Sequence, residues 1–122
     1  MLKSLAIVKK SFSKSATSHW LMQRLTAVLL IPLTIKLLVF LDLCMNAAYQ
    51  QTVDWLKSPI NTILIEVWLL ATFYHAALGL QVVIEDYVAN PGLQAKLIKA
   101  VNLGCLLLAV AALFFMFRVI NP

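Results

Sequence analysis

The sequence has few charged residues. Only 12% of its 122 residues are Asp, Glu, Lys or Arg, whereas soluble domains carry about 25%. Apolar residues make up 62% of the chain. This composition excludes a disordered chain, a nucleic-acid-binding domain and an ordinary soluble enzyme, and it predicts a membrane protein. We therefore expect the net charge of +5 to reflect basic residues gathered on one side of a membrane.

Cysteine motifs, internal repeats and low-complexity segments are also missing. Cys44 and Cys105 are the two cysteines and form no CxxC pair, which argues against a disulfide framework or a thiolate metal site. Residues 1–18 lack the apolar stretch and cleavage site of a secretory signal peptide. This lysine-rich segment is interpreted as a basic cytoplasmic tail, with a short transit peptide as the alternative.

The apolar runs predict an all-α integral membrane protein. A spanning helix needs about 20 residues, and three such runs, at about 22–44, 59–85 and 97–119, form one anchor domain over 19–122. Pro32 is expected to kink the first span. Lys36 within that span must either lie against neighbouring helices or extend its ammonium to the membrane surface.

The basic residues predict the orientation of the chain. Three spans place the N-terminal segment and the 85–99 loop on one side, where seven basic residues gather: Lys3, Lys9, Lys10, Lys14, Arg24, Lys96 and Lys99. The other side has Lys57 and Arg118. Under the positive-inside rule the N-terminus faces the cytoplasm, or the matrix in an organelle, and the C-terminus faces outward.

His75 is an ionisable residue near the middle of the second span, and such residues are functional candidates by default. It shares one helical stripe with Trp68, Gly79, Val82 and Asp86. The imidazole could bind a metal or haem, relay protons, or hydrogen-bond to a Ser, a Thr or a carbonyl of a neighbouring helix. Gly79, one turn away, leaves room for a flat macrocycle or equally for close helix packing.

Haem in electron-transfer proteins usually takes two strong axial ligands. The only other histidine, His19, lies before Arg24 at a different depth in the membrane. If His75 binds haem, we therefore expect the second ligand to come from a partner subunit.

Asp86 and Tyr87 follow at the cytoplasmic end of the second span. A phenol can donate a hydrogen bond to a quinone carbonyl, and a neighbouring carboxylate can pass protons to it. The alternatives are an interfacial belt tyrosine and a simple helix-end charge. Arg24, expected on the same side, could pair with Asp86 or with haem propionates.

Two segments and the three-span layout carry a resemblance to a known family. The segments are HWLMQRLTAV at 19–28 and HAALGLQVVIEDYV at 75–88. Over about residues 18–119 the chain resembles the hydrophobic membrane anchor (D) subunit of bacterial succinate dehydrogenase, in its alphaproteobacterial form. The Asp-Tyr end of the second span favours this subunit over its companion C anchor subunit.

The resemblance implies a set of roles. The two anchor subunits hold a b-type haem between their helices, with His75 as one axial ligand. Tyr87 and Asp86 belong to the ubiquinone site, Arg24 lies near the propionates or the quinone, and His19 is assigned there loosely. Succinate is oxidised on a flavoprotein subunit, not on this chain, and electrons pass through an iron–sulfur subunit. The location implied is the bacterial inner membrane, or the mitochondrial inner membrane if the protein is organellar.

Two alternatives come from other functional classes. The chain could be a small proton or ion transporter subunit with Glu66, His75 and Asp86 as a relay. Glu66 lies about 180° from His75 on the second helix, which argues against one continuous path. The chain could also be a membrane scaffold without a cofactor.

Overall fold

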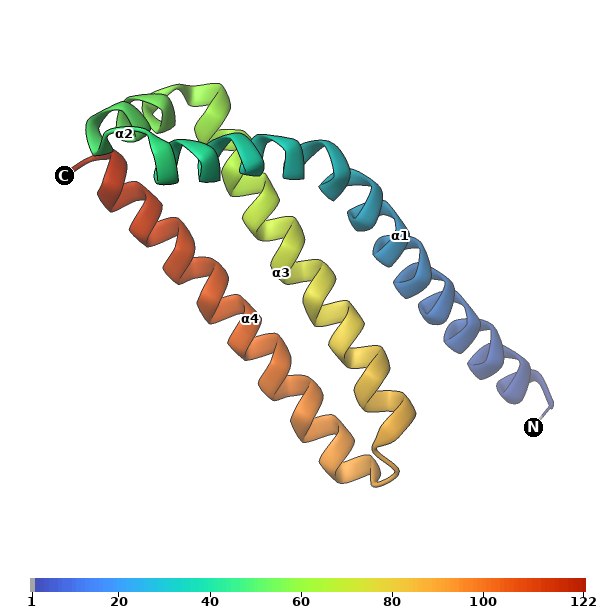
Figure 1. Cartoon of the computed structure of the whole chain (residues 1–122). Coiled ribbons are helices and arrows are strands. Elements are labelled where there is room, and N and C mark those ends of the chain that lie inside the picture. Colours follow the sequence, from blue (N-terminus) through green and yellow to red (C-terminus); the bar gives the residue numbers. More distant parts are fainter. Residues whose placement is uncertain (1) are drawn as a thin grey trace.

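The computed structural model of the chain describes residues 2–122, without the side chains of residues 5–16. The described residues form four helices, which are α1 (Leu2–Asn46), α2 (Tyr49–Lys57), α3 (Pro59–Tyr87) and α4 (Pro91–Ile120), and they form no strand. Figure 1 shows α3 between α1 and α4, with α2 at one end. The predicted all-α class is therefore confirmed.

Three helices are long and apolar enough to cross a membrane. These segments are Thr17–Asn46, Pro59–Tyr87 and Pro91–Ile120, and each encloses one of the spans predicted from the sequence. Helix α1 has 45 residues and is about 67 Å long at 1.5 Å per residue, roughly twice the apolar thickness of a bilayer. The segment expected as a tail, from Leu2 onward, is thus helical and continues directly into the first span.

Prolines mark the bend and the helix starts. Pro32 lies inside α1, which bends part-way along its length, as expected where a proline removes a backbone hydrogen bond (Figure 1). Pro59 and Pro91 open α3 and α4, where a missing N–H costs nothing. The Asn90 side chain accepts hydrogen bonds from the amides of Gly92 and Leu93, at 2.9 and 3.2 Å, and so caps α4.

Helix α2 occupies the polar stretch between the first two spans, where the sequence predicted no element. It buries Thr52, Val53 and Leu56 and exposes its other face. The ring of Trp55, also in α2, stacks on Phe40 of α1 with centroids 5.9 Å apart. The helix therefore packs across the end of the bundle as a lid on α1 and α3.

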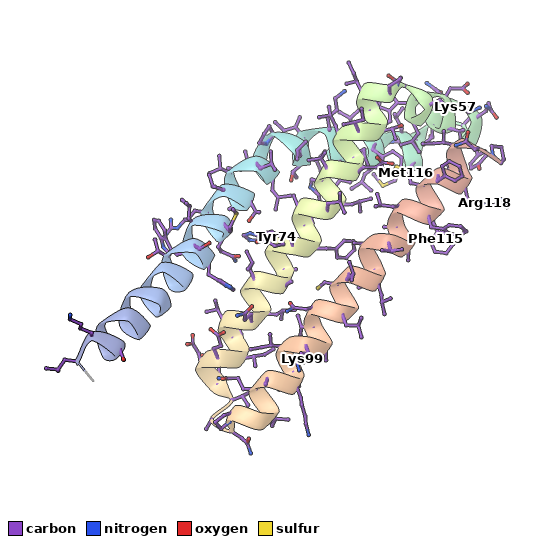
Figure 2. The ribbon with its side chains drawn as sticks, turned by 180° about the vertical axis from the view of Figure 1, so that it is seen from behind. Lys57, Tyr74, Lys99, Phe115, Met116 and Arg118 are labelled. Carbon is purple, nitrogen blue, oxygen red and sulfur yellow. The ribbon has the colours of Figure 1, made fainter. Side chains whose placement is uncertain are left out.

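Few side chains are buried within the chain itself. Seven apolar residues among those described form the core: Leu33, Val53, Leu56, Ile65, Ala71, Leu78 and Ala109. Most other large apolar side chains of the three long helices are exposed, as expected for helices surrounded by lipid or by partner helices. Figure 2 shows Lys99 toward one end of the bundle and Lys57 and Arg118 at the opposite end.

Candidate functional site

The contact between α1 and α3 carries an unusual series of polar residues for a membrane protein. Three hydrogen bonds cross it: Thr26 Oγ1 to His75 Nδ1 at 2.8 Å, Trp68 Nε1 to Thr34 Oγ1 at 3.1 Å, and Lys36 Nζ to Asn61 Oδ1 at 2.9 Å. As the residue numbers rise on α1 they fall on α3, so the helices are antiparallel. We call this set the α1–α3 polar interface. In an apolar environment such bonds fix the register of two helices.

His75 lies half-buried in this interface. The hydrogen bond to Thr26 is the interhelical contact that the sequence left open as one alternative. It uses only the Nδ1 atom. The Nε2 atom makes no hydrogen bond with any described residue, and it is not among the fully buried polar atoms without a partner. The second ring nitrogen therefore stays accessible for a further partner.

Gly79 faces α1 one turn beyond His75. A Cβ placed on Gly79 would lie 3.4 Å from Nε2 of Gln23, an ordinary van der Waals distance. This distance places Gly79 in contact range of α1. The Gln23 Oε1 atom is itself buried without a hydrogen-bond partner, and so is Oγ1 of Thr72, three residues before His75. Unpartnered buried polar atoms are rare, so their presence near His75 distinguishes this region.

Asp86 and Tyr87 close the last turn of α3 and are both exposed. Tyr87 is 84% exposed, and its hydroxyl makes no hydrogen bond with a described residue. Asp86 lies eleven residues beyond His75, about 16 Å along the helix axis. The acid and the phenol thus stand together at one end of the bundle, away from the histidine.

Arg24 does not pair with Asp86 among the described side chains. Its guanidinium lies over the ring of Trp20, 5.2 Å from the centroid. Arg24 directly follows Gln23, and Gln23 lies opposite Gly79. Gly79 is about 6 Å along the α3 axis from His75. Its depth therefore falls between those of His75 and Asp86.

His19 lines a groove that the sequence did not predict. The groove lies along α1, α3 and α4 and has a volume of about 420 Å³. Its lining is mostly apolar, with His19, Tyr74, Gln81 and Asn102 as the polar members. Tyr74 is labelled about midway along α3 in Figure 2. His75 is not part of this lining, so the structure does not bring the two histidines to one site.

Lys36 is partly buried and contacts α2 and the first turn of α3. Besides its bond to Asn61, its ammonium lies 5.5 Å from the ring centroid of Trp55 in α2. Asn61 also donates to the Trp55 carbonyl at 3.0 Å. Sequence reasoning missed this cluster because its members lie in three separate segments. A lysine in an apolar helix was the one available signal.

The described residues contain no group of three or more His, Cys, Asp or Glu that could hold a metal ion. No hydrogen bond or ion pair among the described side chains joins Glu66 to His75. What the interface offers is a single histidine with one accessible ring nitrogen. That donor suits an axial position on a metal already held in a macrocycle.

Comparison with known proteins places the chain in a family. A family model described as the succinate dehydrogenase/fumarate reductase transmembrane subunit matches residues 4–117. The chain is 40% identical over 105 residues to a succinate dehydrogenase hydrophobic membrane anchor subunit of Rickettsia bellii, covering 86% of this chain and 84% of that protein.

The corresponding subunit of Rickettsia prowazekii is 37% identical, with 83% and 81% covered. A succinate dehydrogenase membrane anchor subunit of Reclinomonas americana is 33% identical, with 62% and 66% covered. No solved structure matches. The chain belongs to the family of succinate dehydrogenase/fumarate reductase transmembrane subunits.

Proposed function

We propose that this chain is the hydrophobic membrane anchor of a succinate:ubiquinone oxidoreductase. The three membrane-length helices provide the anchor, and the relatives carry that name. Flavoprotein and iron–sulfur subunits would dock at the end of the bundle that bears Asp86 and Tyr87. Succinate oxidation takes place on the flavoprotein and not on this chain.

The observation that carries the cofactor proposal is the state of His75. One ring nitrogen is engaged by Thr26, and the other is accessible and unbonded. His75 would hold the iron of a b-type haem through Nε2, and a histidine of the companion C subunit would complete the axial pair. When bound, haem supplies a one-electron redox centre. The orphaned Gln23 and Thr72 atoms support a further partner beside His75.

The quinone proposal rests on the end of α3. The free hydroxyl of Tyr87 would donate a hydrogen bond to a ubiquinone carbonyl oxygen. The carboxylate of Asp86, exposed to water, would pass protons toward the quinone as it is reduced. Both residues stand where electrons from an iron–sulfur subunit docked at this end would arrive.

Arg24 and His19 support these two sites in the proposal. The depth of Arg24, between His75 and Asp86, suits a guanidinium that binds haem propionates or the quinone side. His19 lines the groove on α1, α3 and α4. Seven basic residues at one end and two at the other favour an N-terminus facing the cytoplasm or matrix.

The test is to purify the chain with its native partners in detergent. Copurifying flavoprotein and iron–sulfur subunits, together with a b-type band in the reduced-minus-oxidised absorption spectrum, support the full proposal. The same partners without haem would keep the anchor role and reject His75 as a ligand. A chain that purifies without either would reject the proposal altogether.

A further inference from the structure

Two threonines of α1 make the same pair of contacts at the α1–α3 polar interface. Thr34 Oγ1 lies 2.6 Å from the carbonyl of Leu30, four residues earlier, and 3.1 Å from Trp68 Nε1. Thr26 Oγ1 lies 2.8 Å from the carbonyl of Met22, also four residues earlier, and 2.8 Å from His75 Nδ1. Each hydroxyl therefore meets at least one carbonyl acceptor on its own helix and one nitrogen on α3.

The direction of the bond at Thr34 follows from chemistry alone. An indole N–H can only donate, so Thr34 Oγ1 is the acceptor from Trp68. A hydroxyl has a single proton, and that proton goes to the Leu30 carbonyl. A threonine in this position thus offers α3 an acceptor and no donor.

The same constraint applies at Thr26. The carbonyls of Met22 and Gln23, at 2.8 and 3.1 Å, both compete for its one proton. With that proton on a carbonyl, as at Thr34, the imidazole donates from Nδ1–H, and a neutral imidazole that carries its proton on Nδ1 has its lone pair on Nε2. Thr26 is only 9% exposed, so water does not readily replace it as the acceptor.

We propose that Thr26 is a positioning residue that holds His75 in the Nδ1–H tautomer and aims Nε2 at the haem iron. This inference rests on the proposed function, since it concerns the ligand named there. A hydrogen bond accepted from the outer nitrogen fixes the ring orientation of a metal-bound histidine and increases its basicity as a ligand. A more basic ligand favours the ferric state, so Thr26 would lower the haem midpoint potential.

The variant that tests this is Thr26→Val, which keeps the shape of the side chain and removes the acceptor. In the purified complex we expect haem to be held about tenfold more weakly or worse. We also expect the haem midpoint potential to rise by up to about 59 mV. For a one-electron couple, this rise corresponds to a tenfold change in the ratio of oxidised to reduced haem. Redox titration of the haem band and the EPR g-values of the ferric haem provide the readouts.

Thr34→Val is the matched control, because it removes an equivalent bond between the same two helices without touching His75. Thr34→Val should leave the midpoint potential and the g-values unchanged. Thr26→Ser keeps the hydroxyl and should show the wild-type values of both. Equal effects of Thr26→Val and Thr34→Val would overturn the proposal, since a merely structural bond would act in that way. If Thr26→Val fails to assemble, a wild-type potential in Thr26→Ala overturns it equally.

The outcomes distinguish the role of His75 as haem ligand from the role of Thr26 as positioning residue. A complex whose haem survives His75→Ala would reject His75 as the ligand, and with it the role of Thr26, while the anchor role would stand. A complex that loses haem with His75→Ala but is indifferent to Thr26→Val would keep the ligand and reject only the role of Thr26.

Discussion

At the scale of single residues, Tyr87 is a candidate whose side chain is 84% exposed. Its hydroxyl makes no hydrogen bond with a described residue, so Tyr87→Phe should leave the fold intact. We expect this variant to slow ubiquinone reduction, by about 10-fold or more if the hydroxyl acts in proton transfer. Succinate oxidation measured with a soluble dye should stay normal.

The control for this prediction is Tyr49→Phe. Tyr49 begins α2 at the opposite end of the bundle and is 75% exposed. It is thus a surface tyrosine remote from the proposed quinone site. If both variants reduced quinone at the wild-type rate, Tyr87 would be an interfacial belt residue only.

Gly79 supports a second prediction at this scale. A Cβ there meets only the mobile end of Gln23 at 3.4 Å, so Gly79→Ala should assemble normally. A bulky Gly79→Leu side chain should push α1 from α3 and lower the yield of assembled complex in size-exclusion chromatography. An equal yield from both variants would contradict the packing described for this position.

Sequence reasoning identified His75 but not its partner. The imidazole stands out because ionisable residues are rare inside apolar spans. Thr26 does not stand out, because a threonine is tolerated anywhere on a membrane helix. Pairing it with His75 requires the register of α1 against α3, which depends on the whole interface and not on a local pattern.

At the scale of elements, the three long helices were predictable and α2 was not. The spans follow from local hydropathy and from length, which a single sequence contains. Helix α2 has only nine residues, too few to be stable alone, and it folds because it packs across α1 and α3. Its apolar face is buried only when α1 and α3 are in place.

The cluster of Lys36, Asn61 and Trp55 predicts how firmly α2 is held. Lys36→Met removes a charge-assisted hydrogen bond and a cation–π contact. Only the cation–π contact reaches α2, so its local opening should become easier by about 0.5–2 kcal/mol. Amide hydrogen exchange over residues 49–57 should therefore accelerate by about 2-fold to 30-fold.

Lys57→Met is the matched control for that measurement. Lys57 is an exposed lysine at the end of α2, and it takes no part in the cluster. Its substitution should leave the exchange rates of α2 close to wild type. Similar exchange in both variants would mean that Lys36 does not secure the helix.

At the scale of the whole molecule, the uneven distribution of basic residues predicts the orientation. The turn between α3 and α4 lies at one end of the bundle, next to the first turns of α4 that carry Lys96 and Lys99. Helix α2 lies at the other end of the bundle (Figure 1). After Cys44 and Cys105 are replaced by alanine, single cysteines can be placed at Ala89 and at Gln51. Both positions are exposed.

A membrane-impermeant maleimide should then label Gln51→Cys in intact cells and spare Ala89→Cys until the membrane is opened. The positive-inside rule gives this direction, because the tail, Arg24 and the first turns of α4, with Lys96 and Lys99, are basic. Labelling of Ala89→Cys in intact cells would show the inverted orientation and would move the proposed quinone site to the wrong side.

The exposed apolar surface of the three long helices suits contact with lipid or with the helices of a partner subunit. Among the described side chains few are buried, and Nε2 of His75 makes no hydrogen bond. The proposed companion helices and haem would account for the second feature.

The most direct test of this account is the haem content of the purified complex carrying His75→Ala, compared with Thr34→Val. Each substitution removes one hydrogen bond between α1 and α3, but only the first removes the proposed ligand. The account predicts that the b-type band is lost or strongly reduced in His75→Ala and retained in Thr34→Val. An unchanged band in His75→Ala would contradict it.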